Sequence, residues 1–243
     1  MTRSHSPNNS GGNAAIYVLI VVALFAALGF VLMRQSDTSE SNRLSTERRS
    51  LIVNQMLAYP YQAKQAIDMM TSVGMTDASD IDFTRPDATG FESASDTALS
   101  YTRKVYHPTG GGLIPARIPP EAVSDSSYSN PAAGWYLGRP TSLEWSNSTE
   151  ADVILSAFPL TLEICQAIND KLSPGLSPNP PVISGPTFQN AFIPEEDAAG
   201  NNIHGGSNIA EFDTGMCGAC EGKPSLCVGD GTRYGFYSLI VNQ

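Results

Sequence analysis

The sequence predicts an α+β protein with a long N-terminal helix, first membrane-spanning and then amphipathic, followed by a loop-rich globular head. We expect the head to contain a mainly antiparallel sheet and one packed helix. Three observations support this fold. Residues 14–33 form an apolar run without an ionisable side chain, and residues 34–73 repeat apolar side chains with a helical period. After Gly74, glycine and proline separate short apolar runs, a pattern typical of strands joined by loops.

The charge of the chain is divided unevenly along its 243 residues, which carry a net charge of −10. Residues 1–73 contain 6 Lys/Arg and 4 Asp/Glu, whereas the remainder contains 8 Lys/Arg and 20 Asp/Glu, for net charges of +2 and −12. With 41% apolar residues the chain is not of disordered composition. Nucleic acid is not an expected partner, because phosphate repels a head of this charge.

The apolar run has the length of a membrane helix, because twenty helical residues extend about 30 Å. Three alternatives deserve consideration. A cleaved secretory signal would end near Ala27-Leu28-Gly29, but the apolar run continues through Met33, beyond an ordinary signal sequence. A lipoprotein anchor needs a cysteine just after the run, and the first cysteine is Cys165. A buried core helix rarely has twenty consecutive residues without a charge.

The next segment is predicted to continue as an amphipathic helix that ends at Gly74. Pro60 lies within this helix, and we expect it to bend or interrupt the helix, since proline removes one backbone donor. The positions of the apolar face are Leu44, Leu51, Ile52, Met56, Ala63, Ala66, Ile67 and Met70.

Within the head, four apolar runs are predicted strands, at residues 101–107, 113–118, 153–158 and 233–241. The last follows Asp230-Gly231, a favoured hairpin turn. The one clear helix comes from four leucines and isoleucines that recur every four residues between positions 160 and 172.

The four cysteines, Cys165, Cys217, Cys220 and Cys227, all lie in the head. An even number of cysteines beyond a membrane anchor favours two disulfides in an oxidising compartment, and therefore a C-terminus outside the cytoplasm. Among the three possible pairings we expect Cys165 to bond with Cys217 or Cys220, and the other of these two with Cys227. The alternative is a zinc site of Cys217, Cys220 and Cys227 with His204 or Cys165 as the fourth ligand, although the spacing fits no standard zinc motif.

Catalytic and cofactor signals are weak, so we predict no catalytic residue, no metal and no cofactor. The three histidines are His5, His107 and His204, too few for an evident triad. Gly110-Gly111-Gly112 lacks the lysine of a phosphate loop and reads as a turn. Acidic and amide side chains at positions 195–197, 201 and 202 match no calcium loop and read as a solvated loop.

The N-terminal pattern resembles the type IV pilin and pseudopilin superfamily. A short polar segment, MTRSHSPNNSGG, places Gly12 directly before the apolar helix, and a strand-rich head with late cysteines follows. The head is similar, more loosely, to pilin-like proteins of alphaproteobacteria in four stretches, residues 74–81, 106–112, 165–169 and 234–241. The resemblance implies a leader at residues 1–12, cleavage between Gly12 and Asn13 by a prepilin peptidase, an N-terminal helix at 13–73, and a head at 74–243.

One position departs from the resembled family. Most major pilins have a glutamate as fifth residue of the mature chain, which neutralises the N-terminal ammonium of a neighbouring subunit. Here that residue is Tyr17, or Ile16 if cleavage follows Gly11, and the first carboxylate belongs to Asp37. Two explanations stay open: the protein is a minor, tip-proximal subunit, or the Tyr17 hydroxyl and free carbonyls solvate the amine. Tyr17 as an ordinary interfacial aromatic of an anchor is the simplest alternative.

The function implied by the resemblance is that of a structural subunit in a type IV pilus-like or secretion-type filament. Its helix, with Tyr17, Phe25 and Phe30, would reside in the inner membrane and then pack with copies of itself or other pilin-like subunits. A prepilin peptidase and an inner-membrane assembly machinery are further expected partners, and the filament would lie at the cell surface or in the periplasm. The alternative functions are a single-pass membrane-anchored ligand-binding protein and, third, an extracytoplasmic enzyme.

Overall fold

The structure is a computed structural model, and its residues fall into two compact units, 1–48 and 49–243, which we describe separately. It describes residues 12–73, 76–88, 91–92, 96–125, 131–146, 150–196, 202–203 and 211–242. Within these ranges it describes the backbone alone at residues 12–15, 29–44, 195–196 and 202–203.

The first unit contains the beginning of helix α1, Gly12–Ser72. The helix carries described apolar side chains from Ile16 to Leu28, thirteen residues. Among the helical residues that the structure describes, none forms a segment long and apolar enough to cross a membrane. The predicted membrane-spanning N-terminal helix is therefore wrong.

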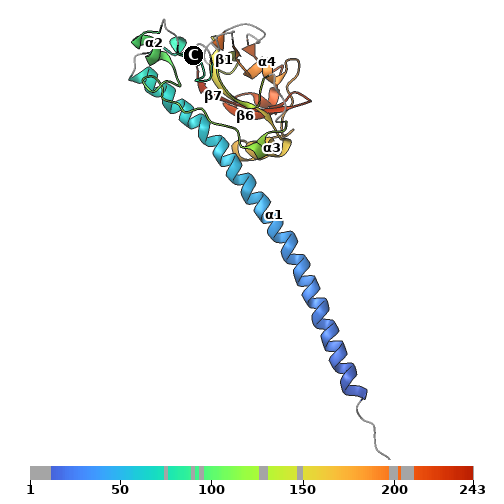
Figure 1. The fold of residues 1–243 in the computed structure, drawn as a ribbon. Helices are drawn as coiled ribbons and strands as arrows, with labels where there is room; N and C mark the ends of the chain where they lie inside the picture. Colours follow the sequence, from blue (N-terminus) through green and yellow to red (C-terminus); the bar gives the residue numbers. More distant parts are fainter. Residues whose placement is uncertain are drawn as a thin grey trace, which may run out of the picture. The chain divides into compact units, whose positions relative to one another are not determined.

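The second unit is built on a mixed five-stranded sheet with strand order β5-β1-β2-β7-β6 (Figure 1). Neighbouring strands are antiparallel except β1 and β5, which run parallel. The sheet of this α+β unit, predicted to be mainly antiparallel, is thus mixed, with three antiparallel pairs and one parallel pair. Its strands are β1 (Gly134–Leu143), β2 (Asp152–Leu160), β5 (Glu211–Phe212), β6 (Ser225–Gly229) and β7 (Tyr234–Val241).

Both faces of the sheet are covered, so that the whole of β2 is buried. On one face, alternate residues of β2 such as Val153 and Leu155 join a core with α1 and with α3 (Leu162–Leu172). On the other face, Ile154 and Phe158 join a second core with α4 (Phe188–Phe192). A strand buried on two sides needs apolar residues at successive positions, which explains the run Val-Ile-Leu in β2.

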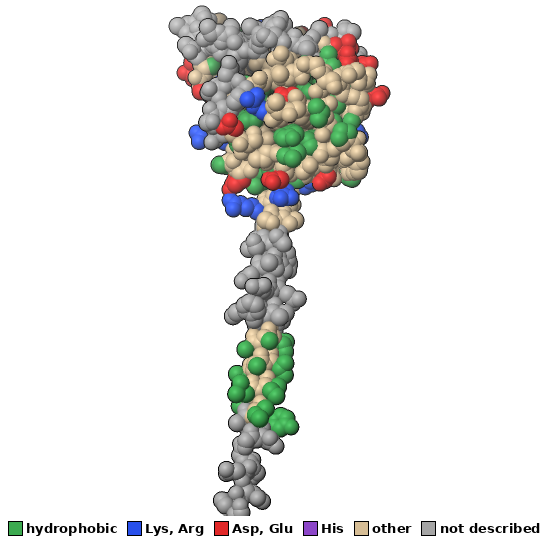
Figure 2. All heavy atoms as spheres, turned by 90° about the vertical axis from the view of Figure 1, so that its right-hand side faces the viewer, with side chains coloured by type: hydrophobic (Ala, Val, Ile, Leu, Met, Phe, Trp, Pro, Cys, Tyr) green, Lys and Arg blue, Asp and Glu red, His purple; other side chains and the backbone are tan. Residues whose placement is uncertain are grey.

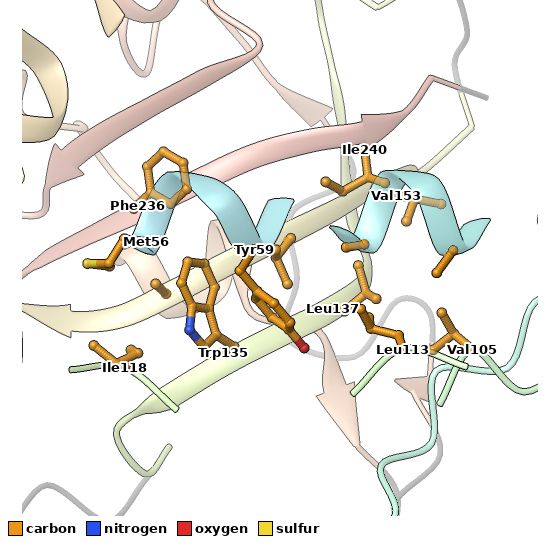
Figure 3. Packing of buried hydrophobic residues seen from close by; sticks show 14 of the residues in the cluster. Met56, Tyr59, Val105, Leu113, Ile118, Trp135, Leu137, Val153, Phe236 and Ile240 are labelled. Carbon is orange, nitrogen blue, oxygen red and sulfur yellow. The ribbon is translucent and has the colours of Figure 1, made fainter. Parts of the chain in front are cut away.

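The later part of α1 belongs to the first core. Met56 and Tyr59 face Trp135 of β1 and Phe236 of β7 (Figure 3). The ring centroid of Trp135 lies 5.0 Å from that of Tyr59 and 6.3 Å from that of Phe236, the latter edge to face. Such aromatic contacts stabilise a core beyond the area that they bury.

The predicted apolar face of this helical segment is largely confirmed. Its buried members are Ile52, Met56, Ala63, Ala66, Ile67 and Met70. Leu51 is instead 69% exposed, and the side chain of Leu44 lies outside the described residues. The helix runs through Pro60 without an interruption, contrary to the break that we allowed for.

The second core is rich in aromatic rings that stack across the sheet and α4. The ring of Phe192 lies parallel to that of Tyr237 at a centroid distance of 4.4 Å, and Phe188 stacks on Phe158 at 5.4 Å. Gly235 leaves room for this packing, because a Cβ atom there would lie 2.4 Å from Cζ of Phe188. Burial raises the pKa of Tyr237, whose hydroxyl donates a hydrogen bond to the carbonyl oxygen of Lys223 at 3.1 Å.

Two predicted strands, at 153–158 and 233–241, correspond to β2 and β7, and the predicted head helix corresponds to α3. The strand predicted at 101–107 is wrong, because α2 (Ala98–Arg103) occupies its first part. Its start is fixed by a capping box between Thr97 and Ser100, which satisfies free backbone donors. Residues 113–118, the other predicted strand that is wrong, belong to no helix or strand.

The head also packs more helices than the one predicted, since α1 and α4 contact the sheet as well as α3. The remaining short elements are η1 (Ala78–Asp80), η2 (Pro120–Ala122), η3 (Gly218–Cys220), and a small hairpin of β3 (Glu195–Glu196) and β4 (Asn202–Ile203).

Candidate assembly surface

The first described side chains of α1 form an apolar surface on every side of the helix. All thirteen residues from Ile16 to Leu28 are apolar and exposed, and Tyr17 and Phe25 are 70% and 72% exposed. The space-filling view shows hydrophobic side chains along this whole segment (Figure 2). We call residues 16–28 the apolar segment. A helix without a polar face has to be buried on all sides.

The energy at stake in covering the apolar segment is large. Ten of its side chains are large hydrophobic groups that are 49% to 72% exposed. Burying such a side chain completely contributes about 1.5–3 kcal/mol. One neighbouring helix covers only one side, so full burial needs several neighbours around the segment. The sequence contains no carboxylate between Asn13 and Gln35 that would oppose such packing.

The other residues predicted to take part in leader cleavage and helix packing are Gly12, Asn13 and Phe30, and the structure describes only their backbone. Gly12 is the first residue of α1 and Asn13 the second, with their backbone alone described. Phe30 likewise has a helical backbone, and its side chain lies outside the described residues, as do residues 1–11 entirely.

A second surface feature lies within the head, where α1, the end of α3 and the edge of the sheet enclose a groove of about 610 Å³. Apolar residues such as Leu57, Phe236 and Ile240 line it. Lys64 of α1 and Lys171 of α3 also line it, and none of its described lining residues is an aspartate or glutamate. We call this feature the lysine groove. Sequence reasoning missed it, because its walls come from segments more than a hundred residues apart.

All four cysteines form disulfides, but the pairing that we expected is wrong. Cys165 bonds with Cys227, and Cys217 bonds with Cys220. The first bond joins α3 to β6, because Cys165 belongs to α3 and Cys227 belongs to β6. Both residues are fully buried between the helix and the sheet. The second closes a single turn around η3. With every thiol consumed in a disulfide, these residues are not zinc ligands.

The disulfide between α3 and β6 is reinforced by a side-chain amide. The side-chain amide of Asn169 donates a hydrogen bond to the backbone carbonyl oxygen of Cys227 at 2.8 Å. Its Oδ1 atom accepts a hydrogen bond from the backbone N–H of Cys227, also at 2.8 Å. The amide thus pairs with β6 as a neighbouring strand would. Because β6 is an edge strand, this pairing also protects one position from association with another chain.

A buried cation was also missed from the sequence. Lys104 is 2% exposed, and its ammonium lies 2.8 Å from Asp96 and donates to the carbonyl oxygen of Phe91. The rings of Phe91 and Tyr101 lie 5.5 and 5.6 Å from this nitrogen, within cation–π range. The aromatic residues close to Lys104 in the sequence, Tyr101 and Tyr106, are the signal that could have indicated it.

The other residues considered for chemistry show no assembled site. His107 stacks on Tyr101 at 4.5 Å, and its Nδ1 lies 2.7 Å from the Thr109 hydroxyl. Within the described ranges, no three His, Cys, Asp or Glu residues are placed to hold a metal. His204, Asp197 and Asn201 lie outside the described residues, and so do the side chains of residues 195, 196 and 202.

Comparisons with protein-family models, with curated proteins and with solved structures find no match to this chain.

Proposed function

We propose that the protein is a structural subunit of a filament of the type IV pilus-like or secretion type, assembled through the apolar segment of α1. The observation that carries this proposal is a contrast within one helix. Its later residues, such as Met56 and Ile67, are buried in the head core, whereas residues 16–28 are exposed on all sides. A segment of this kind gains most from a bundle of equivalent helices supplied by other copies.

The head of this subunit is proposed to reside outside the cytoplasm. Two disulfides with no free cysteine are typical of proteins that mature in an oxidising compartment. The acidic charge of residues 74–243 fits an exposed surface that repels non-specific association.

Maturation is proposed to occur by cleavage after Gly12, which frees the amine of Asn13. This amine would enter an apolar bundle that lacks the usual glutamate. Burying a charge without a partner costs several kcal/mol. The subunit therefore belongs at the tip of a filament, or its amine is solvated by the Tyr17 hydroxyl of a neighbour and by free carbonyls.

The intact mass of the protein isolated from its own cells tests this proposal. A chain that begins at Asn13 supports it, as does loss of processing in a Gly12→Val variant. Gly11→Val is the matched control, because it changes the same residue type one position earlier and should still be cut. An uncut wild-type chain, or a mature chain that begins at Phe30, contradicts the proposal.

A further inference from the structure

The lysine groove has a charge opposite to that of the head in which it lies. Residues 74–243 carry 20 carboxylates and 8 basic side chains, yet Lys64 and Lys171 line the groove without any described carboxylate among the lining residues. Lys64 pairs with Asp68 of the same helix at 3.0 Å, with both side chains half exposed, and Lys171 donates to Asn54. An ammonium has three donors, so each lysine retains hydrogen-bonding capacity toward a ligand in the groove.

Helix α3 presents complementary side chains at its two ends. Lys171 and Leu172 at its last turn belong to the groove, and Leu172 is 36% exposed. Leu162 and Glu163 open its first turn, where Leu162 is 40% exposed and Glu163 is exposed as well. The eleven residues of α3 separate the two ends by about 16 Å. The first turn of α3 thus carries an exposed leucine and an exposed carboxylate, and its last turn lies in an apolar groove with two ammonium groups.

We propose that the lysine groove of one copy binds the first turn of α3 from a second copy. The side chain of Leu162 packs against the apolar wall formed by Leu57 and Leu172, and the carboxylate of Glu163 pairs with Lys171 and Lys64. This inference rests on the proposed function, because it places the contact between heads in the assembly formed through the apolar segment.

The symmetry of this contact fits an extended assembly. The two surfaces are different parts of the same chain, so the contact is heterologous, and each copy keeps one free groove and one free α3 turn. Repetition of a heterologous contact gives a ring if the rotation closes and an open filament if it does not. The charges supply orientation, because the rest of the acidic head is repelled by its counterpart in the neighbouring copy.

Zero-length cross-linking of the full chain tests the contact. Unlabelled and ¹⁵N-labelled copies are mixed, a carbodiimide couples carboxylates to amines, and mass spectrometry identifies the joined peptides. The expected product joins Glu163 of one isotope to Lys171 or Lys64 of the other. Glu163→Gln should lower the yield of these products at least about tenfold, whereas Glu92→Gln, at an exposed carboxylate elsewhere on the head, should leave it unchanged.

A charge exchange gives a second, independent readout. Copies with Glu163→Lys should not cross-link through this position among themselves, but they should do so with copies that carry Lys171→Glu. Sedimentation of the same samples reports whether copies associate at all. Association without the cross-link from Glu163 overturns the head contact and leaves the proposed function intact. Chains that do not associate contradict the proposed function itself, and the head contact with it.

Discussion

Removal of the disulfide between Cys165 and Cys227 should destabilise the head far more than removal of the other disulfide. The two bonds join residues separated by 62 and 3 positions. In the chain-entropy relation, closing a loop of 62 residues removes about 14 cal/mol/K from the unfolded chain, or about 4 kcal/mol at 25 °C, whereas the short loop yields less than about 2 kcal/mol. All four sulfur atoms belong to buried residues, so the packing lost on substitution is comparable.

The assay is urea unfolding of the full chain in a mild detergent that covers the apolar segment, followed by tryptophan fluorescence. Trp135 is a suitable reporter because it packs between Tyr59 and Phe236. The variant with alanine at positions 165 and 227 should lose at least about 2 kcal/mol more than the matched variant with alanine at 217 and 220. Equal losses, or a larger loss in the second variant, would refute the reasoning.

Three further predictions concern the head. Gly235→Ala should destabilise it by about 1–3 kcal/mol in the same assay, since the new Cβ would lie 2.4 Å from the ring of Phe188. Lys104→Met should cost about 3–5 kcal/mol, because it removes the buried ammonium that lies 2.8 Å from the carboxylate of Asp96; replacing both charged residues should recover part of that loss. Burial alone raises the pKa of Asp230, but hydrogen bonds from the backbone and side chain of the following turn outweigh it and lower the pKa below 3.8. The ionised carboxylate therefore contributes its full stabilisation above pH 3.8, and this contribution is lost as the pH falls through the native pKa. Between pH 5 and pH 2, the urea concentration at the unfolding midpoint should fall more steeply for the wild type than for Asp230→Asn.

The predictions for Gly235 and Lys104 each have a control in the same chain. Gly218→Ala should have little effect, because a Cβ atom there meets no atom within 4 Å. An exposed lysine, Lys64, replaced by methionine should change stability by less than about 1 kcal/mol, since its ion pair lies at the surface. A loss at Lys64 equal to that at Lys104 would contradict the argument from burial.

The elements that sequence reasoning located have strong local signals. The four-residue repeat of apolar side chains fixed α3, and Asp230-Gly231 marked the turn before β7. In that turn the Asp230 carboxylate accepts hydrogen bonds from the amides of Thr232 and Arg233 at 3.0 and 2.9 Å. Local chemistry of this kind can be read from the sequence because its partners are neighbours in the chain.

The elements that it missed depend on tertiary structure. Strand β1 contains Gly138 and Pro140, which ordinarily indicate a loop, but the register between β1 and β2 shifts at this point. A bulge tolerates a proline that a regular ladder excludes. The region around Lys104 suggested a strand, whereas the capping box and the buried ion pair organise it as a helix followed by a turn.

Some parts of the candidate site could likewise be predicted from the sequence, and others needed the structure. The apolar segment follows directly from composition, whereas no helix among the described residues is long and apolar enough to span a bilayer. The disulfide pairing depends on the packing of α3 against β6, and the spacing of the cysteines in the sequence does not indicate this packing. The lysine groove requires the approach of residues 54–64, 171–172 and 224–240, and therefore needed the structure.

Photo-cross-linking from within the apolar segment shows directly whether this segment packs against other copies of the chain. A photoreactive phenylalanine analogue replaces Phe25, which is 72% exposed, and in a control replaces Ile114, which is 79% exposed in the head. Mixed isotopic copies are irradiated after assembly in cells. We expect covalent dimers at Phe25 that join the apolar segments of two different copies, and no such product from Ile114. Cross-links from Phe25 that never reach another copy or another pilin-like subunit would contradict this expectation.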